Sequence, residues 1–307
     1  MAKLPSVYIL ILSFNRRDDT LATLESIEKL NVKNFKLTTL VVDNASKDNS
    51  VKALRNFKMN KGRFLLIANK TNLGFSEGNN VGLKRALRQG ADFVMVLNDD
   101  TIVEPNLICD LLAVFKKYPK AGILAPKIYF AKGYEYRSRY KKEDLGKVIW
   151  YAGGDIDWKN VYGTNHGVDA VDKAQFDKVS ETGFATGCCL FVRRQVLKEV
   201  GLFDKRYFAY IEDADLSQRT KRAGWRVLYA PPARLWHKVS QSSGIGSELN
   251  DYFITRNRMI FGLAYAPLRT KVALIRESIR LLFNGRKWQK VGIRDFYLGR
   301  FEKGSWK

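Results

Sequence analysis

The chain has 307 residues, and its 53 lysines and arginines against 31 aspartates and glutamates give a net charge of +22. Its 46% hydrophobic and 12% aromatic residues, with only 7 prolines, exclude a mostly disordered or collagen-like chain. The length allows one large domain with an extension, or two domains. The surplus of positive charge favours a phosphate-bearing partner such as nucleic acid, anionic lipid or a phosphorylated substrate.

The cysteines and the N-terminus indicate the compartment. Cys188 and Cys189 are adjacent, which rarely meets disulfide geometry, and Cys109 is the third cysteine, so a reducing compartment is favoured. The first residues, MAKLPSVYILILSF, lack a small-residue cleavage site and predict a buried strand rather than a signal peptide. No uninterrupted apolar stretch reaches the ~18–20 residues that a membrane span needs. The sequence therefore favours a cytoplasmic protein that is soluble or peripheral.

Four short apolar runs alternate with helical stretches in the first hundred residues. This alternation predicts an α/β fold with a mostly parallel sheet and helices on both faces. Ligands of such sheets bind beyond the carboxyl ends of the strands. The predicted strands are 7–14, 36–42, 64–68 and 93–97, and the predicted helices are 20–30, 47–57 and 78–90.

Polar residues gather where these strands end, which predicts one crevice at the carboxyl edge of the sheet. The alternative is that such residues collect at any turn, because they bond their own backbone. Their recurrence at successive strand ends favours the crevice. They are Ser13, Asn15, Asp43, Asn44, Asn69, Asn72, Asn98, Asp99 and Asp100.

Residues 131–180 are rich in charged and turn residues and show little periodicity. Trp150, Trp158 and their neighbouring tyrosines are costly to leave in water, so we interpret the segment as an ordered excursion over the crevice rather than a disordered linker. Beyond it, we predict a strand over 187–192 and a helix over 194–200.

The last 56 residues carry a net charge of +10. Within 268–283, apolar residues recur at helical spacing with arginines between them, which is typical of a basic amphipathic helix on an anionic membrane surface. An ordinary helix that packs back on the main domain is the alternative. The apolar residues are Val272, Ile275, Ile279, Leu282 and Phe283, and the arginines are Arg269, Arg276 and Arg280.

Two acidic pairs can carry chemistry. Asp99 and Asp100 follow the fourth strand, where hard oxygen ligands suit Mg²⁺ or Mn²⁺ bound to a diphosphate, although acidic pairs are also common in turns. Glu212 and Asp213 begin a helix predicted over 212–223, whose dipole keeps a carboxylate ionised and able to accept a proton. Acids are also simply good helix-start residues. His237 closes a strand-like run and is either a metal ligand or a packing residue.

The order of several motifs resembles the inverting family 2 glycosyltransferases, especially their rhamnosyltransferase-like branch. The resemblance covers roughly residues 5–240 and implies a GT-A (Rossmann-like) fold, a nucleotide-diphospho-sugar donor and a divalent cation. The motifs are SFNR at 13–16, VVDNAS at 41–46, NLGFSEGNNVG at 72–82, LNDDT at 97–101, TGCCLFVRR at 186–194, GLFDKRYFAYIEDADL at 201–216, RAGWRVLYAP at 222–231 and WH at 236–237.

By position, the resemblance implies a role for each matched residue on the donor side. Asp43 accepts from the imide N–H of uracil or thymine, and Asp100, last in the family's DxD motif, binds the cation with His237. Asn98 stands where the motif usually has aspartate, which weakens any role for it as a metal ligand. The whole donor set that we predict is Ser13, Asn15, Arg16, Asp43, Asn44, Asn72, Gly74, Asn98, Asp99 and Asp100.

On the acceptor side, the resemblance implies that Asp213 is the general base, and we expect Glu212, Gly187 and Trp158 to contact the acceptor. The base removes a proton from an acceptor hydroxyl as that oxygen attacks the anomeric carbon opposite the diphosphate. The cation absorbs the charge of the leaving group, and a single displacement inverts the anomeric centre. The branch favours dTDP-L-rhamnose as donor, and UDP-sugars stay open because Asp43 can hold either pyrimidine.

The resemblance implies transfer of one sugar to a glycan or lipid-linked glycan in surface polysaccharide synthesis. The basic C-terminal region would bind the inner face of the plasma membrane. We expect a catalytic domain over 1–250, made of a nucleotide-sugar half (1–130), the excursion (131–180) and an acceptor half (181–250), with a basic helical extension over 251–307. One alternative is a nucleic-acid-binding protein, but acidic residues cluster where a polyanion would have to approach. Another is an inactive module that binds a sugar nucleotide, but the presence of Asp100, Asp213 and His237 argues against it.

Overall fold

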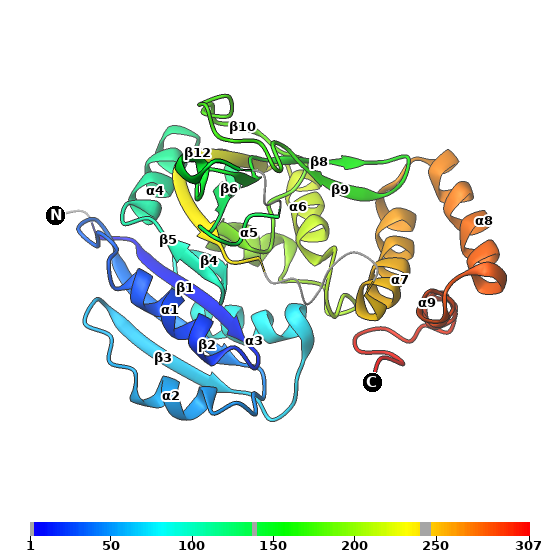
Figure 1. The fold of residues 1–307 in the computed structure, drawn as a ribbon, viewed down its shortest axis with the longest axis horizontal. Helices are drawn as coiled ribbons and strands as arrows, with labels where there is room; N and C mark the ends of the chain where they lie inside the picture. Colours follow the sequence, from blue (N-terminus) through cyan, green and yellow to red (C-terminus); the bar gives the residue numbers. More distant parts are fainter. Residues whose placement is uncertain (1–2, 137–139, 240–246) are drawn as a thin grey trace.

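The computed structural model describes residues 3–136, 140–239 and 247–307, and a ten-stranded sheet forms its centre (Figure 1). The strands are β1 (Ser6–Ser13), β2 (Lys36–Asp43), β3 (Arg63–Ala68), β4 (Phe93–Asn98), β5 (Thr101–Val103), β6 (Ala121–Phe130), β7 (Ile149–Tyr151), β10 (Ser180–Glu181), β11 (Cys189–Arg193) and β12 (Arg226–His237). Their order is β10-β12-β6-β11-β4-β1-β2-β3, with β5 paired to β12 and β7 to β6.

The sheet is mostly parallel, as predicted. Strands β3, β2, β1 and β4 run parallel, and so do β6 and β12, whereas β11 runs antiparallel to both β4 and β6. The helices that pack against the sheet and follow its strands are α1 (Arg17–Ile27), α2 (Ser50–Asn56), α3 (Gly74–Arg88), α4 (Leu107–Lys117), α5 (Arg194–Val200) and α6 (Glu212–Arg222), with a short 3₁₀ helix at Lys142–Asp144.

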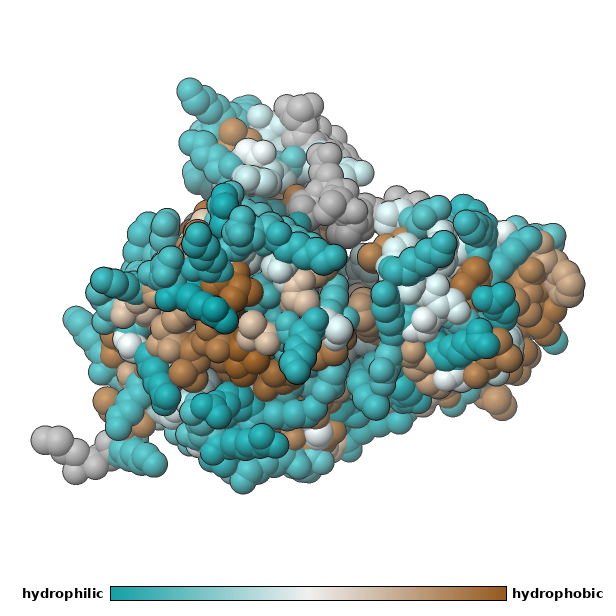
Figure 2. Space-filling view, turned by 90° about the horizontal axis from the view of Figure 1, so that it is seen from below, coloured by the Kyte–Doolittle hydropathy of each residue, from teal (hydrophilic) through white to brown (hydrophobic). Residues whose placement is uncertain are grey.

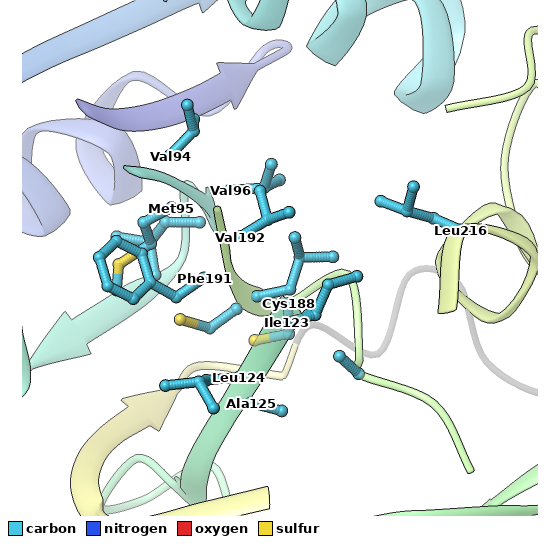
Figure 3. Packing of buried hydrophobic residues seen from close by; sticks show 14 of the residues in the cluster. Val94, Met95, Val96, Ile123, Leu124, Ala125, Cys188, Phe191, Val192 and Leu216 are labelled. Carbon is cyan, nitrogen blue, oxygen red and sulfur yellow. The ribbon is translucent and has the colours of Figure 1, made fainter. Parts of the chain in front are cut away.

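The core lies between the sheet and these helices, and Figure 3 shows its packing around β4, β6 and β11. The aromatic rings of Phe93, Phe115 and Phe191 stack there with centroids 5.2–5.5 Å apart. Since the middle strands are buried on both faces, their sequences are continuous apolar runs, which is why the sequence predicts them well.

Two central elements, α4 and β6, escape prediction from the sequence. All ten residues of β6 are buried, yet its sequence AGILAPKIYF contains Pro126 and Lys127. The ammonium of Lys127 is fully buried and pairs with Asp172 at 2.8 Å and Asp177 at 2.5 Å. These two carboxylates belong to the predicted excursion, so a pairing distant in sequence makes a lysine compatible with a central strand.

Some element limits also differ from prediction. The strand predicted from residue 187 begins at Cys189, because the N–H of Gly187 bonds a side chain instead of a strand. Helix α3 begins at Gly74 rather than at residue 78. Gly74 has a left-handed φ of +75°, a conformation that glycine adopts readily.

The excursion carries a hairpin, β8 (Gly154–Asp157) paired with β9 (Tyr162–Asn165), and its β7 and β10 join the main sheet. These short strands give part of the segment regular structure, and its limits and its place over the crevice stay predictions. Residues 137–139 of the excursion lie outside the described residues, as do 240–246 of the predicted catalytic domain.

The chain ends in three helices, α7 (Glu248–Tyr265), α8 (Leu268–Asn284) and α9 (Lys287–Tyr297), which pack against one another at one end of the molecule (Figure 1). Helix α7 is largely buried, whereas α8 buries only Leu274 and Ser278. The division predicted after residue 250 stays a prediction, and it falls inside α7, which is part of the packed body. Among the helices of the described residues, none is both long enough and hydrophobic enough to cross a bilayer.

Candidate active site

A cavity of about 490 Å³ opens beside the carboxyl ends of β4 and β12. Residues distant in sequence share it: Asn98 at the end of β4, His237 at the end of β12, and Glu212 and Asp213 at the start of α6. The hairpin β8–β9 and helix α7 complete its walls. Glu212 and Asp213 therefore line the cavity directly, whereas Asp100 is connected to it through His237, whose Nε2 is 3.0 Å from Asp100 Oδ1.

The loop that begins α6 has an unusual backbone. Tyr210 and Ile211 have φ values of +71° and +75°, a left-handed conformation that costs of order 1–3 kcal/mol for a branched side chain. The buried side chain of Asn257 on α7 holds this loop, because its Nδ2 donates to the carbonyls of Ala209 (2.8 Å) and Tyr210 (2.9 Å). Helix α7 thereby fixes the position of the following two acids.

Asp213 is held by two backbone donors. Its Oδ2 accepts from the N–H of Gly187 and its Oδ1 from the N–H of Ala214, both at 2.7 Å. Burial raises the pKa of Asp213 above its ordinary value, and the two N–H donors offset part of that rise. A carboxylate with a raised pKa is a stronger base, so this side chain suits proton abstraction.

The neighbouring acid, Glu212, has a different environment. It is only 5% exposed, and its Oε2 has no hydrogen-bond partner among the described residues. Burial and the charge of Asp213 raise the pKa of Glu212 well above its ordinary value, which favours the protonated acid. The two adjacent acids therefore differ in environment, because backbone donors hold Asp213 whereas Oε2 of Glu212 has no partner among the described residues.

Asp100 lies between two basic side chains. Its Oδ2 accepts from Nη1 of Arg16 at 2.7 Å, and its Oδ1 is 3.0 Å from Nε2 of His237. Burial alone would raise the pKa of Asp100, but His237 and Arg16 together lower it below its ordinary value. The carboxylate is therefore ionised at neutral pH.

Asp100 and His237 fit a divalent cation as a pair of ligands. Thr101 pairs with His237 between β5 and β12, which brings the imidazole beside the carboxylate. The buried Nδ1 of His237 has no hydrogen-bond partner among the described residues, and no group of three His, Cys, Asp or Glu residues in that part of the chain could hold a metal. A carboxylate and an imidazole suit Mn²⁺ or Mg²⁺ when diphosphate oxygens and waters complete the shell.

Asp43 has a buried carboxylate oxygen that accepts no hydrogen bond from the described residues. It is fully buried at the end of β2, and its Oδ1 accepts from the N–H of Ser46 at 2.9 Å. Its Oδ2 is buried and has no hydrogen-bond partner among the described residues, which is the state expected of an oxygen that receives a ligand's N–H.

Other predicted donor residues bond one another. Asn44 donates to Asn72 Oδ1 at 2.8 Å and to the carbonyl of Gly74 at 3.2 Å, and so fastens the loop before α3. Ser13 bonds Thr20 at 2.7 Å, and Asn15 accepts from the N–H of Lys47 at 2.7 Å. Ser13, Asn15, Asn44 and Asn72 do not belong to the lining of the cavity described above, and their contact with a donor stays a prediction.

Asp99 and Trp158 do not line the cavity. Asp99 is 8% exposed, and burial together with Asp100 raises its pKa to about 8. Trp158 stacks on Phe261 of α7 with ring centroids 5.6 Å apart, and Phe261 lines the cavity. Trp158 thus supports the wall, and its contact with an acceptor stays a prediction.

Sequence reasoning missed three features of the site. Trp150 lines the cavity with its ring 4.8 Å from that of His237, and its cost in water was the only signal for it. Nothing in the sequence pointed to Phe261 or Asn257. Both lie on a buried helix, and hydrophobic periodicity does not show that a residue of that helix contacts a loop almost fifty residues away.

Comparisons with known proteins identify relatives of this chain. The family model described as "Glycosyltransferase like family 2" matches residues 5–262. N-acetylglucosaminyl-diphospho-decaprenol L-rhamnosyltransferase of Mycobacterium tuberculosis is 34% identical over 154 residues, which are 50% of this chain and 49% of that enzyme. Poly-beta-1,6-N-acetyl-D-glucosamine synthase of Staphylococcus aureus is 24% identical over 298 residues, 92% of this chain and 65% of that enzyme. The chain spans less than two thirds of both curated relatives.

A solved structure has the same fold. GalNAc-T7 with UDP, GalNAc and Mn²⁺ superposes with a TM-score of 0.60 at 15% identity, over 96% of this chain and 57% of that one. At this identity the likeness concerns the fold alone. It confirms the GT-A-type architecture expected from the motifs.

Proposed function

The chain belongs to glycosyltransferase family 2 and is a glycosyltransferase, and on that premise we propose that it is a metal-dependent inverting enzyme that transfers one sugar to a hydroxyl. The observation that carries this proposal is the shared cavity, whose lining includes both Asp213 and His237, the residue that contacts Asp100. This arrangement supports a base that faces the acceptor and an anchor that faces the diphosphate.

Asp213 takes the proton of the acceptor hydroxyl while its two backbone donors keep the carboxylate in place. The acceptor oxygen bonds to the anomeric carbon as the bond from that carbon to the diphosphate breaks, so one displacement inverts the centre. Glu212, in its protonated form, donates a hydrogen bond to the acceptor. Asp100 and His237 would hold the cation, which supplies positive charge at the diphosphate when bound.

We propose dTDP-L-rhamnose as the donor. The 34% identity to a rhamnosyltransferase supports this choice, and the open Oδ2 of Asp43 supports a pyrimidine with an imide N–H. UDP-sugars are the alternative donors, because uracil and thymine present the same N–H to Asp43.

We propose that the acceptor is a glycan or lipid-linked glycan of surface polysaccharide synthesis, handled at the cytoplasmic face of the membrane. The name of the mycobacterial relative, which acts on a decaprenol-linked sugar diphosphate, supports a lipid-linked acceptor. The net charge of +10 over residues 252–307 supports attachment to anionic lipid.

A donor screen tests the proposal. Thermal shift and sugar-transfer assays would compare dTDP-L-rhamnose, UDP-sugars and GDP-mannose, each with and without Mn²⁺, using a polyprenyl-diphospho-N-acetylglucosamine acceptor. We expect a shift and transfer that need both dTDP-L-rhamnose and the metal. Transfer only from a UDP-sugar selects the alternative donor, and the absence of any donor effect refutes the function.

A further inference from the structure

Helix α8 exposes a continuous apolar stripe. Leu268, Val272, Ile275, Ile279 and Phe283 leave between 40% and 77% of their surface in solvent. Their spacing of three and four residues puts them on one face, within an arc of about 80° when each residue turns the helix by about 100°. Figure 2 shows hydrophobic residues gathered at the end of the molecule that α8 forms in Figure 1.

The stripe differs from the face that α8 uses for packing. Leu274 and Ser278 are the buried residues of α8, and on the same helical projection they point about 140° and about 100° away from the middle of the stripe. Helix α8 therefore packs on the protein through another face while the stripe stays exposed to solvent. The amphipathic character predicted from sequence is present, but its apolar face looks outward rather than toward the core.

Two contacts hold α8 rigidly on the body of the enzyme. Gly262 of α7 approaches so closely that a Cβ there would lie 2.2 Å from Leu274. Arg258 of α7 pairs with Glu277 of α8 at 3.2 Å and donates to the carbonyl of Asn160 at 2.7 Å, next to the hairpin that walls the cavity. Repacking of α8 to cover the stripe would break these contacts.

Charge flanks the stripe on both sides. Arg269, Arg276 and Arg280 project along one edge of it and Lys271 along the other. Glu277, the one acid of α8, is on the opposite side and is already paired. This arrangement of an apolar face between cations matches the boundary between acyl chains and anionic headgroups, where long basic side chains reach the phosphates.

We propose that the stripe of α8 inserts into the surface of an anionic bilayer, with the helix lying in the plane of the membrane. From Leu268 to Phe283 the helix is roughly 22 Å long, too short to cross the ~30 Å hydrocarbon core. A second copy of the chain would bring its own basic edges against these, so the charges favour lipid over self-association. The proposal refines the membrane attachment of the proposed function and adds that apolar insertion, not charge alone, holds the enzyme there.

Vesicle binding by the full chain tests this. The stripe variant combines Val272→Ser, Ile279→Ser and Phe283→Ser, and a matched control combines Tyr134→Ser with Val168→Ser, which are also exposed apolar residues but lie far along the chain. Vesicles would contain phosphatidylcholine with or without phosphatidylglycerol, at low and high salt. We expect the stripe variant to bind anionic vesicles at least tenfold more weakly and to lose the binding that survives high salt, while the control binds like wild type.

The proposal is overturned by either of two results with the stripe variant, or by a wild type that does not bind vesicles. In the first, the stripe variant binds anionic vesicles as wild type does, at both salt concentrations. In the second, wild type is a dimer that the stripe variant converts to monomer, and vesicle binding does not change. Melting curves check that the variants fold. Sugar transfer to a short soluble acceptor, measured on the same proteins, separates the two ideas: vesicle binding without transfer refutes the proposed function alone, and transfer without vesicle binding refutes the insertion alone.

Discussion

Replacing Asp213 with asparagine removes the assigned base while it preserves the size of the side chain. The carboxylate accepts two backbone hydrogen bonds of 2.7 Å, from Gly187 and Ala214. Asparagine has one acceptor oxygen, so one of these N–H groups loses its partner. A buried donor without a partner costs about 1–3 kcal/mol, and we expect the free energy of unfolding to fall by about that amount.

The effect of Asp213→Asn on the reaction is larger. A positioned general base contributes ~10²–10⁴ in rate, so we expect kcat to fall by that factor. At ~1.36 kcal/mol for each factor of ten, the barrier rises by about 3–5 kcal/mol. Asp213 is not among the residues proposed to hold the donor, so donor affinity should stay within about threefold of wild type.

The assay follows nucleotide release and glycoside formation at saturating donor and acceptor, with donor affinity measured by calorimetry on the same protein. Glu212→Gln is the matched control, because it replaces a side chain whose protonated form is already favoured by its raised pKa. We expect this control to lose less than tenfold in kcat. Folded Asp213→Asn protein whose kcat stays within tenfold of wild type refutes the assignment of the base.

Four further predictions use other parts of the molecule. The value of kcat/KM should increase with pH, and the pH at half its maximum should lie above the pKa of an ordinary aspartate, because burial raises the pKa of Asp213 and the base must be deprotonated. A pH–rate profile checks this. His237→Ala should raise the half-saturating Mn²⁺ concentration at least tenfold in a metal titration of activity, whereas an unchanged value rejects the ligand role. Asn257→Ala should lower kcat at least tenfold with little effect on donor affinity, since the loop before α6 loses both its amide contacts; unaltered kinetics in a stable variant would contradict this. Asp172→Ala with Asp177→Ala should lower the free energy of unfolding in urea by about 3–5 kcal/mol, because the buried ammonium of Lys127 loses both carboxylate partners, and a change no larger than that of a single surface substitution would count against the pairing.

The sequence predicts the first half of the fold because its strands are buried on both faces and therefore apolar throughout. It does not predict β6, whose Lys127 is neutralised by residues about fifty positions away. Hydrophobic patterns report local periodicity, and a charge that is satisfied only in the folded chain interrupts them. The antiparallel position of β11 between β4 and β6 is hidden for a related reason, because pairing partners leave no mark on the strand's own sequence.

The donor crevice shows what polar residues at strand ends can and cannot tell. Their gathering at one edge follows from parallel topology, and the structure has that topology. Whether each side chain remains open to a ligand depends on its partners. Asn44 and Asn72 bond each other, whereas Asp43 has a buried oxygen without a hydrogen-bond partner. The sequence does not distinguish these three residues, because all of them are polar residues near strand ends.

The acidic pair of α6 carries this argument to the catalytic step. Glu212 and Asp213 are adjacent, chemically alike and equally favoured by a helix start, so residue type alone gives no reason to choose between them as base. Backbone donors decide it, because two N–H groups converge on Asp213 and stabilise its ionised form, while Oε2 of Glu212 has no such donor. One of those donors comes from Gly187, on the turn before β11. The turn before β11, which is distant in sequence from α6, therefore helps to determine which acid is the base. Moving that turn should change the pKa of Asp213 without a substitution at Asp213 itself.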